Sequence, residues 1–168
     1  MVDVTIRHYD PQDDPMAVSA VYETSWKTAY RGMIPDEYLD NIQPGKWTFT
    51  VENPDRPTLL ALDGQRIVGA SSYSAARRED MAGWGEIISL YLLPEYFGRG
   101  VGFRLMQAAV NELSSLGFRR IYLWVLEENH RARRFYERFG FRPSGAVLDA
   151  NIGGRDVREV QYIYHIAF

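Results

Sequence analysis

Cysteine is absent from the 168 residues, so disulfide bonds, thiolate metal ligands and a cysteine nucleophile are all excluded. The three histidines lie far apart in the sequence, at His8, His130 and His165, and their spacing is not that of a metal site. The chain also lacks an apolar run long enough to cross a bilayer and a charged-then-apolar leader. We therefore expect a soluble cytoplasmic protein with no bound metal and no membrane partner.

A surplus of basic residues is missing too, because 19 lysines and arginines face 22 aspartates and glutamates, for a formal net charge of -3. This balance weighs against a nucleic-acid partner. The charge is uneven, however, since residues 117–142 hold seven arginines and three glutamates. That stretch fits either a basic face for a polyanionic small ligand or a solvated arginine-rich helix.

One domain, residues 1–168, is expected, because the chain can bury one substantial core and is too short for two. Helical spacing of apolar residues predicts helices at 16–30, from Pro35, at 101–116 and after Asn129. Alternation or unbroken apolar runs predict strands at 2–7, on both sides of Asp63 and Gly64, at 85–93, 120–126 and 157–168, with a further short one near Phe141. This order predicts an α/β domain around a mixed sheet, in which the unbroken apolar strand 85–93 is buried on both faces.

A glycine-rich turn, "YFGRGVGFR" at residues 96–104, separates that strand from the following helix. Gly98, Gly100 and Gly102 allow the backbone to turn sharply and to approach a ligand closely. The unpaired N–H groups of the first helical turn and the helix dipole would then face a phosphate or pyrophosphate. A purely structural turn is the alternative.

Two common phosphate loops do not match this turn. A Walker loop ends in Gly-Lys-Ser/Thr, whereas Phe103 and Arg104 follow Gly102 here. The dinucleotide fingerprint needs its third glycine further into the helix. Nucleotide hydrolysis and dinucleotide binding are therefore disfavoured.

Two segments together resemble the central signatures of the GNAT superfamily of N-acetyltransferases: "LYLLPEYFGRGVGFRLM" (90–106) and "NHRARRFYERFGF" (129–141). The resemblance covers essentially the whole chain and implies a GNAT-type α/β fold, a mixed and largely antiparallel central sheet flanked by helices. It also implies direct transfer of an acetyl group from acetyl-coenzyme A (acetyl-CoA), as cosubstrate, to a primary amine of a small molecule. A protein or peptide amine as acceptor, and a non-catalytic CoA-binding regulatory module, are the alternatives.

The resemblance implies a cofactor site on the loop and the strand before it. The loop residues that would bind the pyrophosphate through their amides are Gly98, Arg99, Gly100, Val101, Gly102 and Phe103. The pantetheine arm would run like an added strand beside the main chain of Leu90 and Leu92. Asn129 would contact pantetheine, although a helix N-cap explains it equally well. Phe97 departs from the family pattern, which has Gln or Arg there.

The resemblance also implies two catalytic groups. Tyr136 occupies the position of the tyrosine that protonates the departing thiolate of CoA, and the alternative is a packing role. Glu86 is our candidate for the base that deprotonates the amine, because burial in an apolar strand should raise its pKa. It also stands at the same distance before the glycine loop as the catalytic glutamate of histone acetyltransferases in the superfamily. A carboxylate in solvent at the strand end is the alternative.

The acceptor site implied by the resemblance includes Trp26 and Tyr30, which could hold a cationic amine by cation–π attraction or belong to the core. The aromatic closing segment, 157–168, fits either a homodimer interface or an interior strand.

Overall fold

The structure is a computed structural model that describes residues 2–167. In chain order the elements are β1 (Thr5–His8), α1 (Pro15–Ala29), α2 (Asp36–Asp40), α3 (Thr48–Val51), β2 (Thr58–Asp63), β3 (Arg66–Ala75), the single 3-10 turn η1 (Glu79–Met81), β4 (Gly85–Leu92), a second such turn η2 (Pro94–Tyr96), α4 (Val101–Ser115), β5 (Arg120–Leu126), α5 (His130–Phe139), β6 (Arg142–Ile152) and β7 (Arg155–His165).

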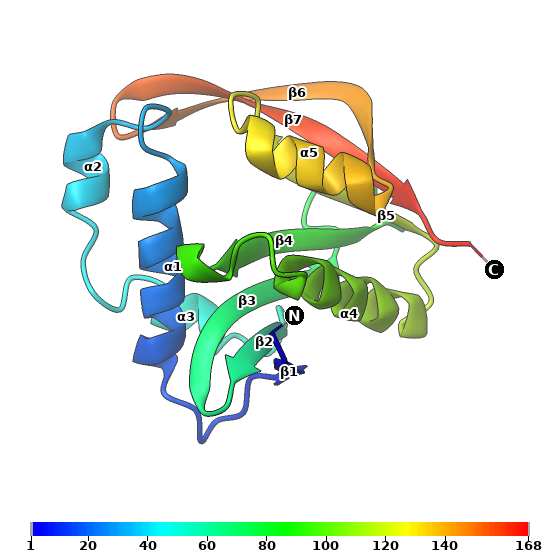
Figure 1. Ribbon diagram of the computed structural model, residues 1–168. Helices are drawn as coiled ribbons and strands as arrows, with labels where there is room; N and C mark the ends of the chain where they lie inside the picture. The colour runs from blue at the N-terminus through cyan, green and yellow to red at the C-terminus, as the bar shows by residue number, and fades with distance from the viewer. Residues whose placement is uncertain (1, 168) are drawn as a thin grey trace.

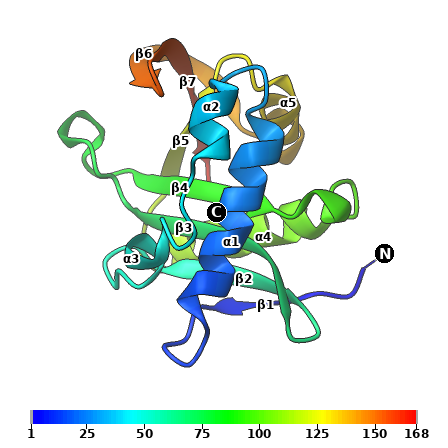
Figure 2. The ribbon, with the colours of Figure 1, turned by 90° about the vertical axis from the view of Figure 1, so that its left-hand side faces the viewer.

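Within the described residues the strands form one seven-stranded sheet in the order β1-β2-β3-β4-β5-β7-β6. Every neighbouring pair is antiparallel except β4 and β5, which are parallel. Helices α1 and α4 both pack on β3 and β4, from opposite faces, and α5 lies over the β5–β7 side (Figure 1, Figure 2). The expected mixed, largely antiparallel sheet flanked by helices is confirmed.

Strands β4 and β5 pair at only two positions, Gly85 with Ile121 and Glu86 with Tyr122. Beyond them β5 continues to pair with β7, whereas β4 has only β3 beside it. Figure 1 shows the β1–β4 part and the β5–β7–β6 part of the sheet spreading apart toward α1. The rest of β4 therefore presents a main-chain edge that no other strand covers.

A β-bulge lies close to the point where β4 leaves β5. Tyr73 of β3 pairs with Ile87, and the preceding Ser72 pairs with Ser89, so Ile88 has no partner. The extra residue reverses the alternation of β4 and bends the strand. Ile87 accordingly faces the core under α4, whereas Tyr91 faces α1.

The expectation that this apolar strand is buried on both faces is only partly right. Its first three residues are buried, but those from Ile88 to Leu92 are half-buried. The open edge toward β5 explains the difference, because apolar side chains there line a gap instead of a continuous sheet.

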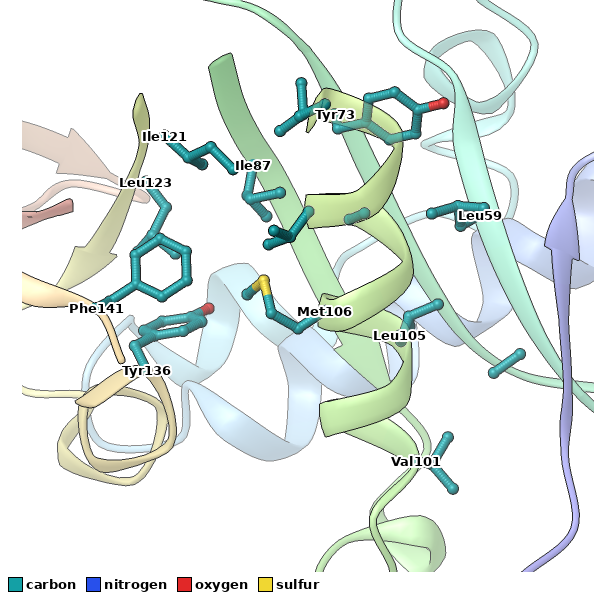
Figure 3. Close-up of a cluster of buried hydrophobic side chains, with 14 of the residues drawn as sticks. Leu59, Tyr73, Ile87, Val101, Leu105, Met106, Ile121, Leu123, Tyr136 and Phe141 are labelled. Carbon is teal, nitrogen blue, oxygen red and sulfur yellow. The ribbon is translucent and has the colours of Figure 1, made fainter. Parts of the chain in front are cut away.

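The main core lies between the sheet, α4 and α5, where Leu105, Met106 and Phe141 are almost fully buried (Figure 3). A second cluster lies under α1 around Val18 and Tyr22. A third lies beneath α2 and includes Ile34, Leu39 and the last residue of β5, Leu126. Most of the expected helices and strands lie within a residue or two of their predicted bounds.

The C-terminal strands differ most from the expectation. The short strand expected near Phe141 is the eleven-residue β6, and β7 begins at Arg155 and ends at His165. The last residue of the predicted 157–168 strand lies outside the described residues. Strand β6 is exposed along most of its length, so it shows no apolar alternation, and its register shifts between Pro143 and Val147. Helix α3 was not expected, because four residues are too few to show a helical period.

No helix within residues 2–167 is both long enough and apolar enough to cross a membrane. The same residues contain no cluster of three or more histidine, aspartate or glutamate side chains suited to a metal ion.

Leu105→Ala tests the core under α4. Leu105 is fully buried, so the substitution should lower the free energy of unfolding by about 2 to 5 kcal/mol, measured by chemical denaturation. Leu116→Ala, at the end of the same helix, is the control, since Leu116 is 63% exposed and should cost about 0.5 kcal/mol or less. Equal losses in the two variants would contradict the packing described for α4.

Candidate active site

The glycine loop bends at two of its three glycines. Gly98 and Gly100 have φ of +73° and +80°, which disfavour any residue with a side chain. A Cβ on either would meet nothing within 4 Å, so the backbone conformation, and not crowding, requires glycine there. Gly102 differs, because a Cβ on it would lie 3.2 Å from Leu92 and 3.4 Å from Phe135. Its small size lets α4 pack closely on β4 and α5.

The first turn of α4 offers free main-chain donors. Gly100 is the N-cap and has no side chain to accept a hydrogen bond. The N–H groups of Val101, Gly102 and Phe103 therefore have no acceptor in the helix, and the positive end of its dipole lies there. Val101 and Gly102 are buried, whereas Phe103 and Arg99 are exposed on the outer side of the loop.

Phe97, where the expected polar side chain is missing, is covered by an arginine from another element. The Arg131 guanidinium carbon lies 3.3 Å from the centre of the Phe97 ring. Arg131 belongs to the first turn of α5 and makes no ion pair with any residue in the described part of the chain. Partial burial lowers its pKa, but the group stays cationic at neutral pH. The loop thus has a positioned positive charge that the sequence analysis did not assign.

Leu90 and Leu92 lie on the open edge of β4 and are half-buried, with side chains packed against the main core. The carbonyl of Leu92 already accepts a hydrogen bond from Ser25 Oγ of α1 at 2.8 Å. A carbonyl oxygen has two lone pairs, so one acceptor position of Leu92 is used within the protein.

Asn129 is the N-cap of α5, and its Oδ1 accepts a hydrogen bond from the Ala132 N–H at 3.3 Å. This is the capping role that we considered for it. Its side-chain Nδ2 donates to no residue within 2–167, so the amide keeps two donors for a ligand.

Tyr136 projects from α5 into the main core and is 9% exposed. Its ring packs on Phe141 and Tyr162, with centroids 6.0 and 6.1 Å away. Figure 3 shows the hydroxyl pointing toward Met106, and it makes no hydrogen bond with any described residue. Burial, and then the charge of nearby Tyr91, raises the pKa of Tyr136 far above its ordinary value. The phenol is therefore protonated at neutral pH and free to donate.

Glu86 is 2% exposed, so it is not a carboxylate in solvent at the strand end. Its Oε1 accepts hydrogen bonds from the main-chain N–H and Nε of Arg77, each at 3.1 Å, and from Tyr122 Oη at 2.8 Å. Its Oε2 accepts a fourth from Arg77 Nη2 at 2.6 Å. Glu86 and Arg77 thus form a tightly held ion pair at the joined end of β4 and β5.

The prediction that the pKa of Glu86 is raised is wrong. Burial does act to raise the pKa, but the hydrogen bonds from Arg77 and Tyr122 together outweigh it, and the pKa of Glu86 is below its ordinary value. The sequence around Glu86 could not show this, because Arg77 comes from the segment after β3.

Trp26 and Tyr30, at the end of α1, pack against each other. They lie on the other side of the gap between β4 and β5 from Tyr136. Their rings are 4.9 Å apart and nearly perpendicular, and Trp26 Nε1 donates a hydrogen bond to Tyr91 Oη at 3.0 Å. Burial is the main cause that raises the pKa of Tyr91 to about 12. Tyr91, on the open edge of β4, thus forms an aromatic wall together with Trp26 and Tyr30. The sequence alone does not mark Tyr91 as a site residue, because it lies within an apolar run.

A recess of about 850 Å³ adjoins the cluster in which Trp26 and Tyr30 pack together with Leu126. Its lining comes from the loop after α1, the end of β5 and the β6–β7 hairpin: Gly32, Met33, Leu126, Glu127, Glu128, Asp149, Ala150, Asn151, Arg155, Asp156, Val157 and Arg158. Acidic residues outnumber basic ones in this lining, which favours cationic ligands.

The contact between α2 and the β6–β7 hairpin limits the far end of the recess. A Cβ on Gly153, at the hairpin turn, would lie 2.6 Å from Tyr38 Cβ of α2. Arg155 Nη1 also donates to the carbonyl of Gly32 at 3.4 Å. The hairpin and the α1–α2 segment therefore touch, and they close this side of the gap.

Comparisons with known proteins agree with this architecture. The mycothiol acetyltransferase of Mycobacteroides abscessus is 32% identical over 154 residues, which are 89% of this chain and 49% of that protein. An uncharacterized N-acetyltransferase of Archaeoglobus fulgidus is 44% identical over 115 residues, which are 64% of this chain and 76% of that protein. The chain thus spans about half the length of the first of these relatives.

Solved structures share the fold at lower identity. The PaiA N-acetyltransferase of Thermoplasma acidophilum in complex with coenzyme A superposes with a TM-score of 0.71 at 22% identity, covering 96% of this chain and 99% of that one. An N-acetyltransferase from Staphylococcus aureus Mu50 gives a TM-score of 0.74 at 16% identity, covering 98% and 99%.

The sequence profile of the Acetyltransferase (GNAT) family matches residues 18–141, the span from α1 to the end of the second signature segment. Most of the elements that build the candidate site lie within this match. The chain therefore belongs to the Acetyltransferase (GNAT) family.

Proposed function

We propose that the protein transfers an acetyl group from acetyl-CoA directly to a primary amine of a small molecule. The observation that carries this proposal is the uncovered edge of β4, which leads toward the glycine loop and carries Tyr91, a residue within electrostatic reach of Tyr136. An extended pantetheine arm can pair with such an edge as a further strand would. The acyl end would then lie between Tyr136 on one side of the gap and Trp26 and Tyr30 on the other.

Hydrogen-bond donors for the phosphates of the cofactor lie at the glycine-loop end of the β4 edge. The free N–H groups of Val101, Gly102 and Phe103 suit the pyrophosphate, as an anion at a helix N-terminus. Arg131, fixed over Phe97, adds a charged donor at the same loop. Leu90 offers its main chain to the pantetheine, and Asn129 offers its side-chain amide. The main chain of Leu92 is less available, because its carbonyl already accepts a hydrogen bond from Ser25.

Tyr136 is the proposed acid. As the C–S bond of the thioester breaks, the departing thiolate takes a proton from Tyr136 Oη. The raised pKa of Tyr136 keeps this proton on the phenol until it is needed.

A small acceptor is favoured over a polypeptide by the contact between the β6–β7 hairpin and the α1–α2 segment. An extended chain could not pass through the gap while that contact is closed, whereas the recess has room for a small amine.

Thiol release should depend on an added amine. We expect wild-type protein with acetyl-CoA to release free CoA thiol when a panel of polyamines, aminoglycosides, amino acids and peptides is screened by a colorimetric thiol assay. Acetyl-CoA without amine is the control. Tight CoA binding in a calorimetric titration, with no release for any amine, would contradict the proposal and favour a regulatory CoA-binding module.

Tyr136→Phe should lower kcat by about 10²-fold or more, because the thiolate loses its proton donor. CoA affinity should be nearly unchanged, since the ring still packs on Phe141. In wild-type protein, kcat should not decline with rising pH until well above pH 10, because the pKa of Tyr136 is raised.

Tyr164→Phe is the matched control for Tyr136→Phe, because its ring packs on Phe139 and Phe141 of the same cluster, away from the gap. A Tyr136→Phe variant as active as Tyr164→Phe would remove Tyr136 as the acid.

Arg131→Gln should raise the Kd of CoA by about tenfold, the typical effect of losing one charge-assisted hydrogen bond. Calorimetric titrations at low and high salt check this, and the difference from wild type should shrink as salt rises. Arg142→Gln is the control, since Arg142 is exposed at the start of β6, beyond the far end of α5. If both variants bind CoA as wild type does, the Arg131 stack serves packing alone.

A further inference from the structure

We propose that the carboxylate of Glu159, on β7, binds the ammonium group of the acceptor and takes its proton before the amine attacks the thioester. This inference rests on the proposed function and names the base that the function requires. It also gives Glu86 a different role from the one expected from sequence.

The strand register places Glu159 on the acceptor side of the sheet. Glu159 lies opposite Leu126 of β5, and residues that are directly opposite in an antiparallel pair project to the same face. Leu126 packs in the cluster beneath α2, together with Val157, which lies two residues before Glu159. The other face of β7 carries Tyr162 and Tyr164, which pack on α5. Glu159 therefore faces the α1–α2 side, where the aromatic wall lies.

The ionisable groups near Glu159 come from three parts of the chain. Arg77 follows β3, Tyr30 ends α1 and Tyr91 lies on β4, and each is within electrostatic reach of the Glu159 carboxylate. Its strand neighbours, Leu126 and Leu148, are uncharged.

Tyr91 is also within electrostatic reach of Tyr136, on the other side of the gap. Tyr91 is thus near both the proposed acid and the proposed base, on the edge where the thioester would lie. Leu126 and Val157, which share the face of Glu159, line the recess, so an amine that enters the recess comes close to Glu159.

Glu159 differs from Glu86 and Glu137 in that its carboxylate has no partner among the described residues. Glu159 is half-buried, and its carboxylate makes neither a hydrogen bond nor an ion pair with any residue within 2–167. Glu86, by contrast, accepts four hydrogen bonds, and Glu137 accepts one from Tyr162. Leaving a half-buried carboxylate unpaired is costly unless a cation joins it.

Its ionisation suits a base. Burial raises the pKa of Glu159 above its ordinary value, and the charge of Arg77 opposes the rise. Glu86 is the poorer base, because its pKa is lowered and its oxygens are occupied by Arg77 and Tyr122. We assign Glu86 as a positioning residue that fixes Arg77 beside Glu159.

The proposed reaction balances as follows. The ammonium group gives one proton to Glu159, and the free amine nitrogen attacks the thioester carbonyl carbon to form the C–N bond. The C–S bond then breaks, and the thiolate takes the proton of Tyr136. The surplus proton on the new amide nitrogen returns Tyr136 to its neutral form, and Glu159 releases its proton to solvent.

Glu159→Gln tests this assignment by two readouts. The first is the pH dependence of kcat/KM for the amine. In Glu159→Gln, kcat/KM should fall by about 10²-fold or more, and its decline at acid pH should disappear. Glu86→Gln should keep that acid-side decline, because it removes a positioning group and not the base. Glu159→Asp should retain it at a reduced rate. An acid-side decline that persists in Glu159→Gln, or that disappears only in Glu86→Gln, would overturn the proposal.

The second readout does not need turnover. The panel amines are titrated calorimetrically into the protein saturated with CoA, and the amine that binds wild type most tightly is compared across variants. Glu159→Gln should weaken its binding by tenfold or more at unchanged CoA affinity and melting temperature. This loss would support the ammonium site even if no thiol release occurred, in which case only the proposed function fails. Equal amine binding in wild type and Glu159→Gln, or no amine binding to wild type, would overturn the inference.

Discussion

Strands β4 and β5 pair across only two residues, and most of the candidate site depends on how short that contact is. If the parallel pairing continued, the main chain of β4 would be satisfied and no ligand could lie beside it. Because it stops after Glu86, the edge from Ile88 to Leu92 is left uncovered, and the bulge at Ile88 turns Tyr91 toward α1. The glycine loop follows β4 after the short turn η2, and α5 follows β5. The contact of Arg131 with Phe97 shows that the N-termini of α4 and α5 lie close together.

Glu86 and Glu159 lie on one face of the sheet, and their different surroundings give the two carboxylates different properties. Glu86 lies where the strands are still joined, is sealed by Arg77 and Tyr122, and has a lowered pKa. Glu159 lies where they have separated, has no partner in the described chain, and has a raised pKa. Arg77 binds the first and acts electrostatically on the second, where its charge opposes the rise in pKa that burial causes. The same gap divides Glu159 from Tyr136, which suits a reaction that removes a proton at one atom and supplies one at another.

The sequence predicted the features that depend on neighbours along the chain. Hydrophobic periodicity located α1, α4, β5 and α5 closely, and the spacing of the glycines predicted a loop whose positive φ at Gly98 and Gly100 is observed. It failed where residues far apart in sequence meet. The pKa of Glu86 depends on Arg77, the polarity of the loop at Phe97 depends on Arg131 of α5, and the importance of Glu159 depends on its register with Leu126. Strand β6 was underestimated for a different reason, since an exposed strand carries no apolar alternation.

The central claim is that the open edge of β4 and the first turn of α4 together hold CoA. Hydrogen–deuterium exchange of the protein with and without CoA tests it most directly, because both segments offer N–H groups that CoA would cover. CoA should slow the exchange of two peptides, one spanning 88–92 and the other 98–103, with little change in β1 and β2. Binding of CoA that leaves both peptides exchanging as in the free protein would contradict the account.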